Sequence, residues 1–217
     1  MNSFKLILTT ILSGFIIVLS TNAQETSEDL DGSAFIDILV EQLIADMPKD
    51  PSYEEPSLNT LFIEGLETLI NPDIVYDPTY RRLDNMCDDI PADVGVCSDV
   101  VIRAFHNVDI CLAEYVCAYR LTEGLPVDTN IDHRRVRNLG ALFNDQGWEI
   151  PVKQSRYAAD YYQPGDIIWW KLGGKTDHIG IVTKNGKVLH NIGNGQVANV
   201  TPFAYRIHKV YRMPVIE

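Results

Sequence analysis

Basic residues are scarce in this sequence. Its 217 residues include 18 Lys and Arg against 30 Asp and Glu, a formal net charge of −12. Proteins that bind nucleic acids or anionic lipids rely on Lys and Arg, so we expect neither partner. With 14 glycines and 11 prolines, the chain is neither collagen-like nor proline-rich. The composition, with 46% apolar residues, predicts a globular protein with one main domain, which we expect to be a monomer.

Hydrophobic runs of membrane-spanning length are also lacking. Lys5 is the only charge in the first 23 residues, and residues 6–19 (LILTTILSGFIIVL) are almost wholly apolar. Small residues, Thr21 and Ala23, stand three and one places before a cut after Ala23. This pattern predicts a secretory signal peptide at residues 1–23 and export to the periplasm or the medium. The alternative, a retained membrane anchor, needs a longer run of about 20 residues.

Cysteine is sparse, and the four cysteines are Cys87, Cys97, Cys111 and Cys117. Export permits disulfides, but four cysteines allow three full pairings and the sequence does not choose among them. Cys111 and Cys117 are six residues apart on an expected helix, so they point to different sides and should not bridge each other. There is no CxxC motif, and the spacing is not that of a zinc ribbon. If one cysteine is catalytic, at least one other thiol stays unpaired.

The spacing of apolar residues predicts helices first and strands later. Helices are expected at residues 34–47, 58–70, 97–108, 109–120 and 136–143. Strands are expected at residues 167–172, 177–183, 188–192 and 205–213. This order predicts an α+β fold with helices on one side of a small antiparallel sheet. We expect a helical extension at residues 24–65 and the main domain at residues 66–217.

Cys97 is predicted to lie in the first turn of a helix, because Gly95 and Val96 precede it and an apolar stripe follows. The free backbone N–H groups there favour an anion, which lowers a thiol pKa. They are also suited to hold an oxyanion. The negative charge of Asp99 opposes the thiolate. The alternative is a buried structural cysteine or a disulfide partner.

Two histidines lie on a predicted hairpin, His178 in DHIGIV and His190 twelve residues later. A two-residue loop would place them on opposite faces of the sheet. A three-residue loop with Gly186 in the left-handed conformation would pair Thr183 with Lys187 and make the histidines diagonal neighbours.

The second arrangement suits catalysis. Cys97 would be the nucleophile, His178 the base that later protonates the leaving amine, and His190 the residue that orients His178. The alternatives are a structural strand histidine with satisfied hydrogen bonds at position 178 and a surface hairpin residue at position 190. A zinc site formed by the same three residues is a further alternative, although their spacing is unfamiliar. We expect no cofactor and no metal.

Six segments together resemble the domain-of-unknown-function family 1287 and, less closely, the NlpC-type cell-wall peptidases of the papain-like superfamily. These segments are YDPTY (76–80), PADVGVCSDVVIRAF (91–105), NIDHRRVRN (130–138), PGD (164–166), HIGIV (178–182) and HNIG (190–193). The resemblance implies a papain-like, NlpC-type catalytic domain at residues 66–217 with its nucleophile at a helix N-terminus. It implies the same roles for Cys97, His178 and His190. One departure is Val96, because NlpC-type enzymes usually have Asp before the Cys-Ser pair.

The resemblance further implies a secreted thiol amidase or peptidase whose partner is a peptide or peptidoglycan fragment. Alternatives are a non-catalytic module that binds cell-wall peptide or glycan, and an acyltransferase with the same thioester chemistry. Arg134, in the basic segment 132–137, is suited to a substrate carboxylate; the alternative is a solvated helix start. The other candidate substrate-binding residues, which the sequence leaves open to a packing role, are Tyr76, Asp77, Tyr80 and His133.

Overall fold

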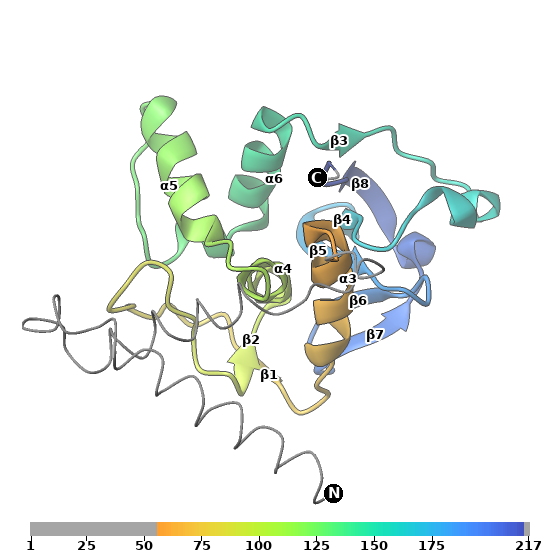
Figure 1. Ribbon diagram of the computed structural model, residues 1–217, viewed down its shortest axis with the longest axis horizontal. Coiled ribbons are helices and arrows are strands. Elements are labelled where there is room, and N and C mark those ends of the chain that lie inside the picture. The colour runs from red at the N-terminus through yellow and green to blue at the C-terminus, as the bar shows by residue number, and fades with distance from the viewer. Residues whose placement is uncertain (1–55, 215–217) are drawn as a thin grey trace, which may run out of the picture. The chain divides into compact units, whose positions relative to one another are not determined.

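The computed structural model describes residues 56–214 (Figure 1). The expected signal peptide, the helix at residues 34–47 and most of the expected extension lie outside the described residues. The described residues belong to one compact unit. Within the described range, none of the helices has the length and apolar character needed to cross a membrane.

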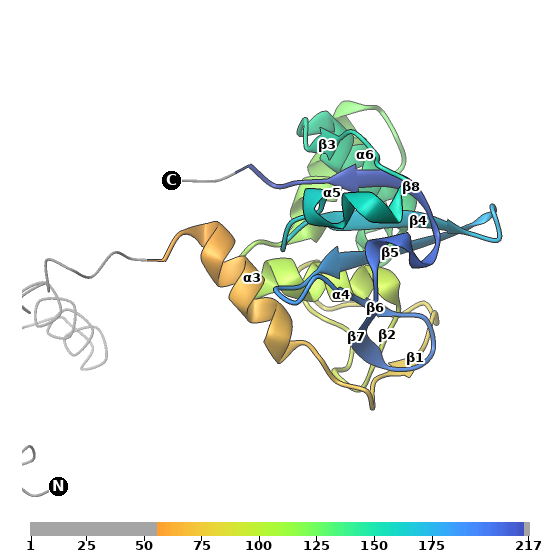
Figure 2. The same ribbon diagram turned by 90° about the vertical axis from the view of Figure 1, so that its right-hand side faces the viewer.

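Over residues 56–214 the fold is α+β, as the sequence predicts, with four α-helices and a six-stranded antiparallel sheet. The helices are α3 (Leu58–Thr68), α4 (Cys97–His106), α5 (Leu112–Thr122) and α6 (Val136–Asp145). The strands of the sheet are β3 (Glu149–Ile150), β4 (Ile167–Leu172), β5 (Thr176–Val182), β6 (Val188–Asn191), β7 (Gln196–Val200) and β8 (Arg206–Tyr211). Their spatial order is β3-β8-β4-β5-β6-β7 (Figure 2). A separate parallel pair joins β1 (Val75–Tyr76) to β2 (Val94–Gly95).

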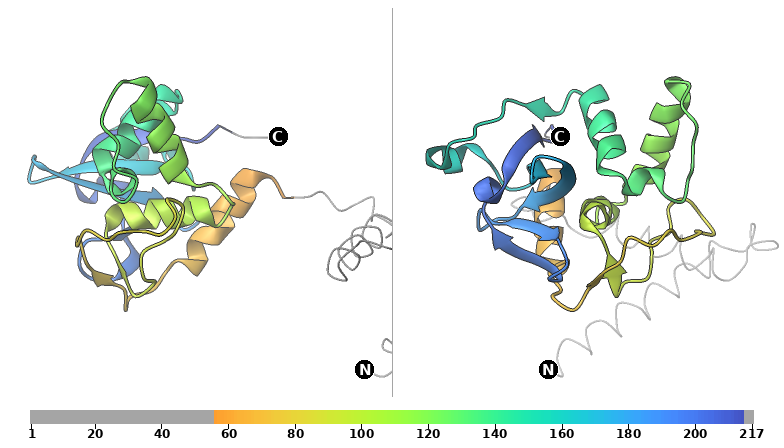
Figure 3. Two further views of the ribbon diagram at one scale, coloured as in Figure 1. Left: turned by 90° about the vertical axis from the view of Figure 1, so that its left-hand side faces the viewer. Right: turned by 180° about the vertical axis from the view of Figure 1, so that it is seen from behind.

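Helix α4 is the centre of the packing, and Figure 1 shows it end-on in the middle of the molecule. It contacts β5 and β6 on one side and α5 on the other. Its apolar side chains, including Val100 and Phe105, share one core with Ile179 and Ile181 of β5. The opposite face of the sheet has its own core around Trp170, covered by short 3-10 turns. The helices therefore lie on one side of the sheet, as expected (Figure 3).

Helix α3 crosses the expected boundary between residues 65 and 66. Phe62 and Leu66 are both buried in the core around α4, and the ring of Phe62 lies 4.9 Å from that of Phe105. These contacts make α3 part of the main unit.

Several elements differ from the prediction, among them the short pair β1 and β2, which was not expected. Strands β3 and β7 were not expected, because neither carries a strong apolar alternation of its own. Helix α5 begins at Leu112 rather than Asp109, which adopts a left-handed backbone (φ 58°) after α4.

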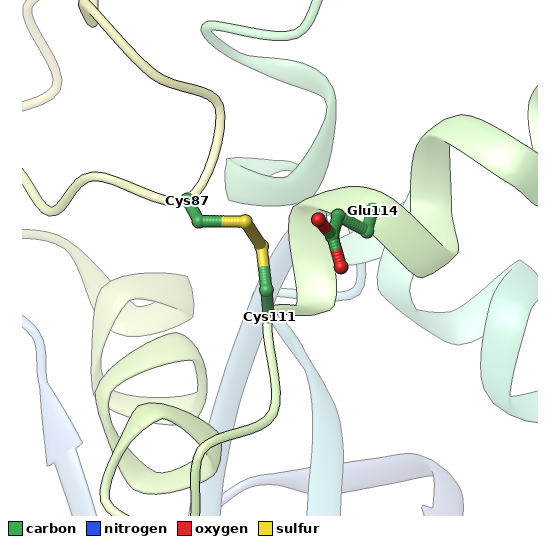
Figure 4. Close-up of side chains that lie close together, drawn as sticks. All are labelled: Cys87, Cys111 and Glu114. Atoms are coloured by element: carbon green, nitrogen blue, oxygen red, sulfur yellow. A yellow bond between two sulfur atoms is a disulfide. The ribbon is translucent and has the colours of Figure 1, made fainter. Parts of the chain in front are cut away.

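Cys111, the N-cap of α5, forms a disulfide with Cys87 across a Cα–Cα distance of 5.6 Å (Figure 4). Cys111 and Cys117 do not bridge each other, as predicted.

Candidate active site

Cys97 is the first residue of α4, which confirms the predicted helix start. Val96 is the N-cap in an extended conformation, and its backbone N–H donates to Asp99 Oδ2 at 2.6 Å. A carboxylate in the first turn satisfies a donor that would otherwise be unpaired and interacts well with the helix dipole. The local sequence thus sets the direction of the helix and the place of the cysteine on it.

Cys97 is 5% exposed, and its thiol faces the backbone N–H of Ile179 on β5. Burial raises the pKa of this thiol to about 11; the charge of Asp99 adds to the rise, and nearby N–H groups, including those of Ile179 and Ser98, oppose it. The sequence left open whether the helix start or the charge of Asp99 dominates; in the resting protein the thiol pKa is raised. Lost hydration of the thiolate outweighs the stabilisation from the helix start, so Cys97 is a neutral thiol at pH 7.

Arg134 holds the start of α4 in place. Its guanidinium donates to Asp99 through Nε–Oδ1 at 2.8 Å and Nη2–Oδ2 at 2.9 Å, and both side chains are buried. Its Nη1 donates to the carbonyl of Thr79 at 3.3 Å. The Ser98 hydroxyl donates to the carbonyl of Arg134 at 2.6 Å. Arg134 was predicted to bind a substrate carboxylate, but its donors serve this internal pair, so we assign it a structural role.

The hairpin between β5 and β6 has the three-residue loop. Thr183 N–H donates to the carbonyl of Lys187 at 2.7 Å, and Val182 pairs with Val188. Gly186 has a positive φ of 72°, which glycine adopts at little cost. The two-residue alternative, which separates the histidines, is therefore wrong.

His178 and His190 are in direct contact. Nε2 of His178 lies 2.8 Å from Nδ1 of His190, and the rings are nearly perpendicular. The ring of Trp170 stacks on His178 with centroids 5.5 Å apart. Burial, and then the charge of His190, lower the pKa of His178 to about 3. Burial also lowers the pKa of His190, partly opposed by its hydrogen bond with Asn199. Both rings are therefore neutral at pH 7.

The amide of Asn199 on β7 sets the proton positions of this pair. Its Oδ1 lies 3.1 Å from Nε2 of His190. With the amide oriented in this way, His190 Nε2 carries the proton and its Nδ1 accepts the Nε2–H of His178. The neutral His178 is left with Nδ1 as an unprotonated acceptor. No described residue donates to that atom, so it is available as a base.

Cys97 faces the backbone N–H of Ile179, the residue that follows His178 on strand β5. The side chain of Ile179 belongs to the core with α4, whereas the ring of His178 stacks on Trp170. Among the described residues, no hydrogen bond joins Sγ to the imidazole. Strand β5 pairs with β6 only from Ile181 onward, which leaves the N–H of Ile179 to face the sulfur. The structure thus brings the two histidines together and places the thiol next to strand β5, without a hydrogen bond to His178.

A cavity of about 510 Å³ opens at Cys97. The first turns of α4 and α6 and the β1 segment form its walls. The lining residues are Tyr76, Pro78, Val96, Cys97, Ser98, Ile131, Arg134, Arg135, Val136, Arg137, Asn138 and Asp177. The cavity is large enough for part of a peptide.

The loop residues predicted to bind substrate divide into two groups. Tyr76 lines the cavity, because it pairs with Gly95, two residues before Cys97. Burial raises the pKa of its hydroxyl, and the nearby Cys97 and Asp99 add to the rise. The others do not line it. Asp77 forms an ion pair with Arg81, and the Tyr80 hydroxyl donates to Asp128 at 3.3 Å. His133 is buried, and burial lowers its pKa to about 4.

Comparison with known protein families identifies the family of this chain. The model of the family described as Domain of unknown function (DUF1287) matches residues 63–213, more than half of the sequence. The chain belongs to the DUF1287 family. This confirms the family expected from the motifs. The uncharacterized protein YijF of Escherichia coli strain K12 is 35% identical over 176 residues, which cover 73% of this chain and 83% of YijF.

The zinc alternative does not fit this DUF1287 protein. Across residues 56–214, the group of ligand atoms that gathers within 4.8 Å consists of Cys87, Cys111 and Glu114. The two sulfurs of that group form the disulfide, with Glu114 beside them (Figure 4). The thiol and the two histidines predicted as ligands do not converge on one point.

Two residues of the candidate site carry no signal in the sequence. Asn199 lies on β7, and nothing in its local pattern relates it to His190 nine residues earlier. Asp177 lines the cavity and accepts hydrogen bonds from Trp169 and Arg137. Neither position carries a sequence signal, because both depend on pairings between separate elements.

Proposed function

We propose that this DUF1287 protein is a secreted thiol amidase or peptidase of papain-like, NlpC-type fold. The proposal depends on one observation: a cysteine at the start of the central helix faces strand β5, which carries His178, and His178 begins the chain His178–His190–Asn199. A helix-start nucleophile packed on an antiparallel sheet that supplies the base is the arrangement the resemblance implies. The disulfide between Cys87 and Cys111 supports export to an oxidising compartment.

The reaction begins from a neutral thiol and a neutral imidazole. As Cys97 Sγ attacks the amide carbonyl, its proton passes to Nδ1 of His178, and the C–N bond breaks when that proton reaches the leaving amine. A thioester remains on Cys97. Water, deprotonated by the same Nδ1, then releases the acid and restores the thiol. The backbone N–H groups of Cys97 and Ser98 are suited to hold the oxyanion.

Proton transfer requires Sγ and His178 Nδ1 to come within hydrogen-bond distance. Catalytic hydrogen bonds are often long in the free enzyme and tighten when substrate binds. We therefore propose that binding in the cavity closes this gap. Because Cys97 is buried away from water, its thiol stays neutral until the substrate is in place, which agrees with its raised pKa.

The substrate class proposed from the resemblance is the peptidoglycan stem peptide. The test is turnover of purified cell-wall peptides, followed by mass spectrometry of the released amine. Cys97→Ala should abolish turnover, whereas Cys117→Ala, which removes the other free thiol, should leave it unchanged. Equal turnover by Cys97→Ala would disprove the proposal.

The raised pKa of Cys97 and the missing hydrogen bond with His178 favour a second candidate, a module that binds such peptides without cleaving them. Both candidates predict peptide binding to the cavity, but only the first predicts a thioester. Acid quenching during turnover, followed by mass measurement of the intact protein, separates them. An acyltransferase would show the same thioester and differ in its acceptor.

A further inference from the structure

The three arginines that line the cavity beside Cys97 differ in what they contact. Arg134 is fully engaged with the buried Asp99. Arg137 forms one bond, from Nε to Asp177 Oδ2 at 2.7 Å, and its side chain is 73% exposed. Arg135 is exposed, and in the described part of the chain its guanidinium has no hydrogen bond or ion pair. Two guanidinium groups of the three are therefore accessible to a ligand.

Asp177 does not depend on Arg137. Its carboxylate also accepts from Trp169 Nε1 at 2.7 Å and from the ammonium group of Lys171. An incoming carboxylate that takes over Arg137 would leave Asp177 paired with Lys171. The exchange is therefore inexpensive, since no buried charge loses its only partner.

The charge of the cavity is positive although the chain carries a net charge of −12. Arg134 is balanced by Asp99 and Arg137 by Asp177, which leaves Arg135 in excess. The carboxylate of Asp128, on which Arg135 exerts a small favourable charge effect, is itself held by Asn130 and Tyr80. Helix α6 begins beside Arg135 without a side-chain cap or an acidic residue in its first turn, which adds positive potential at the same place.

We infer that this cavity binds a free carboxylate of the substrate, held by Arg135 with Arg137, while Cys97 attacks an amide of the same molecule. The substrate class is therefore a peptide with a free carboxylate close to the scissile bond. Guanidinium groups hold carboxylates through paired N–H donors. The inference rests on the proposed function for the attack, although the carboxylate site itself does not require it.

The first test compares two alkylating reagents of similar size, the anionic iodoacetate and the neutral iodoacetamide. We expect the iodoacetate-to-iodoacetamide rate ratio at Cys97 to exceed that at Cys117 by at least about fivefold, since fixed positive charge concentrates anions. Arg135→Gln should bring the ratio within about twofold of that at Cys117. Arg82→Gln, which removes an exposed cation lining a different cavity, should leave the ratio unchanged. A ratio that Arg135→Gln does not alter overturns the inference.

The second test does not depend on the reactivity of the thiol. Glutarate, a dicarboxylate without a scissile bond, is titrated into the protein while arginine Nε–H signals are followed by NMR. We expect saturable shifts of the Arg135 and Arg137 signals, and we expect the Arg137 signal to lose its shift in Arg135→Gln. If Cys97 is inert to both reagents but glutarate binds, the carboxylate site stands and the proposed catalysis fails. If Cys97 hydrolyses peptides but neither glutarate nor the reagent ratio responds to Arg135→Gln, the inference fails and the catalysis stands.

Discussion

The Nε2 atom of His178 lies 2.8 Å from Nδ1 of His190, a contact that depends on the absence of a side chain at Gly180. A Cβ built at Gly180 would lie 2.7 Å from the carbonyl oxygen of Leu189 and 3.0 Å from the Cβ of His190. The hairpin can therefore bring the two imidazoles together only while position 180 is glycine.

Gly180→Ala should destabilise the protein by about 1 to 3 kcal/mol, because the new methyl group meets backbone that cannot move freely. The free energy of unfolding in urea measures this change. Gly65→Ala is the matched control: its Cβ would meet mainly the side chain of Asn107, at 3.0 Å from Nδ2, and alanine favours the interior of α3 by about 1 kcal/mol. Similar effects of the two substitutions would contradict the role assigned to Gly180.

The same substitution should change the free energy of unfolding much more at Arg134 than at the neighbouring Arg135. Arg134→Gln leaves the buried carboxylate of Asp99 unpaired and should cost about 3 to 5 kcal/mol of stability. Arg135→Gln removes an exposed charge and should change stability by less than about 0.5 kcal/mol. Urea unfolding of both variants gives the comparison. A small loss for Arg134→Gln would mean that the pair with Asp99 does not hold the start of α4.

Asn199→Asp should raise the pKa of His190, because a carboxylate beside Nε2 favours the protonated ring. The protonated ring cannot accept the Nε2–H of His178, so the base should lose its fixed tautomer. Long-range ¹⁵N–¹H NMR spectra report the protonation of each imidazole nitrogen directly. In the unmodified protein we expect Nδ1 of both rings to be unprotonated.

Asn194→Asp is the control for this prediction, since it adds the same charge at an exposed position of the neighbouring loop. It should leave both tautomers unchanged. If Asn199→Asp and Asn194→Asp give the same spectra as the unmodified protein, Asn199 does not set the tautomer.

The stability of the fold should fall as the pH decreases below about 6.5. The pKa of His178 is lowered to about 3 and that of His133 to about 4, against an unfolded value of about 6.5. Between these values the unfolded chain binds protons that the folded protein excludes, so acid favours unfolding. For His178 the loss between pH 6.5 and 5 is on the order of 2 kcal/mol.

The measurement is the free energy of unfolding as a function of pH, with His178→Gln as the test variant. Its profile should be flatter than that of the unmodified protein in this range. His208→Gln is a control at an exposed ring and should keep most of the slope. An unchanged slope in His178→Gln would mean that the buried pair titrates elsewhere.

The sequence alone determined the features that depend on neighbouring residues along the chain. The limits of β4 match the predicted strand at residues 167–172, and the start of α4 at Cys97 follows from Asp99 in its first turn and the apolar stripe. The loop type was not determined, because Asn185-Gly186 is compatible with both two and three residues. Contacts of the whole hairpin selected the longer loop.

Only the tertiary structure decided the properties that depend on distant residues. The sequence could not show that burial under β5 raises the pKa of Cys97, nor that Asn199 on β7 reaches His190. Arg134 and Arg135 are adjacent in the chain, yet one faces the buried Asp99 and the other the cavity. Solvation and charge pairing depend on the three-dimensional surroundings of a group, and those surroundings come from segments far apart in the sequence.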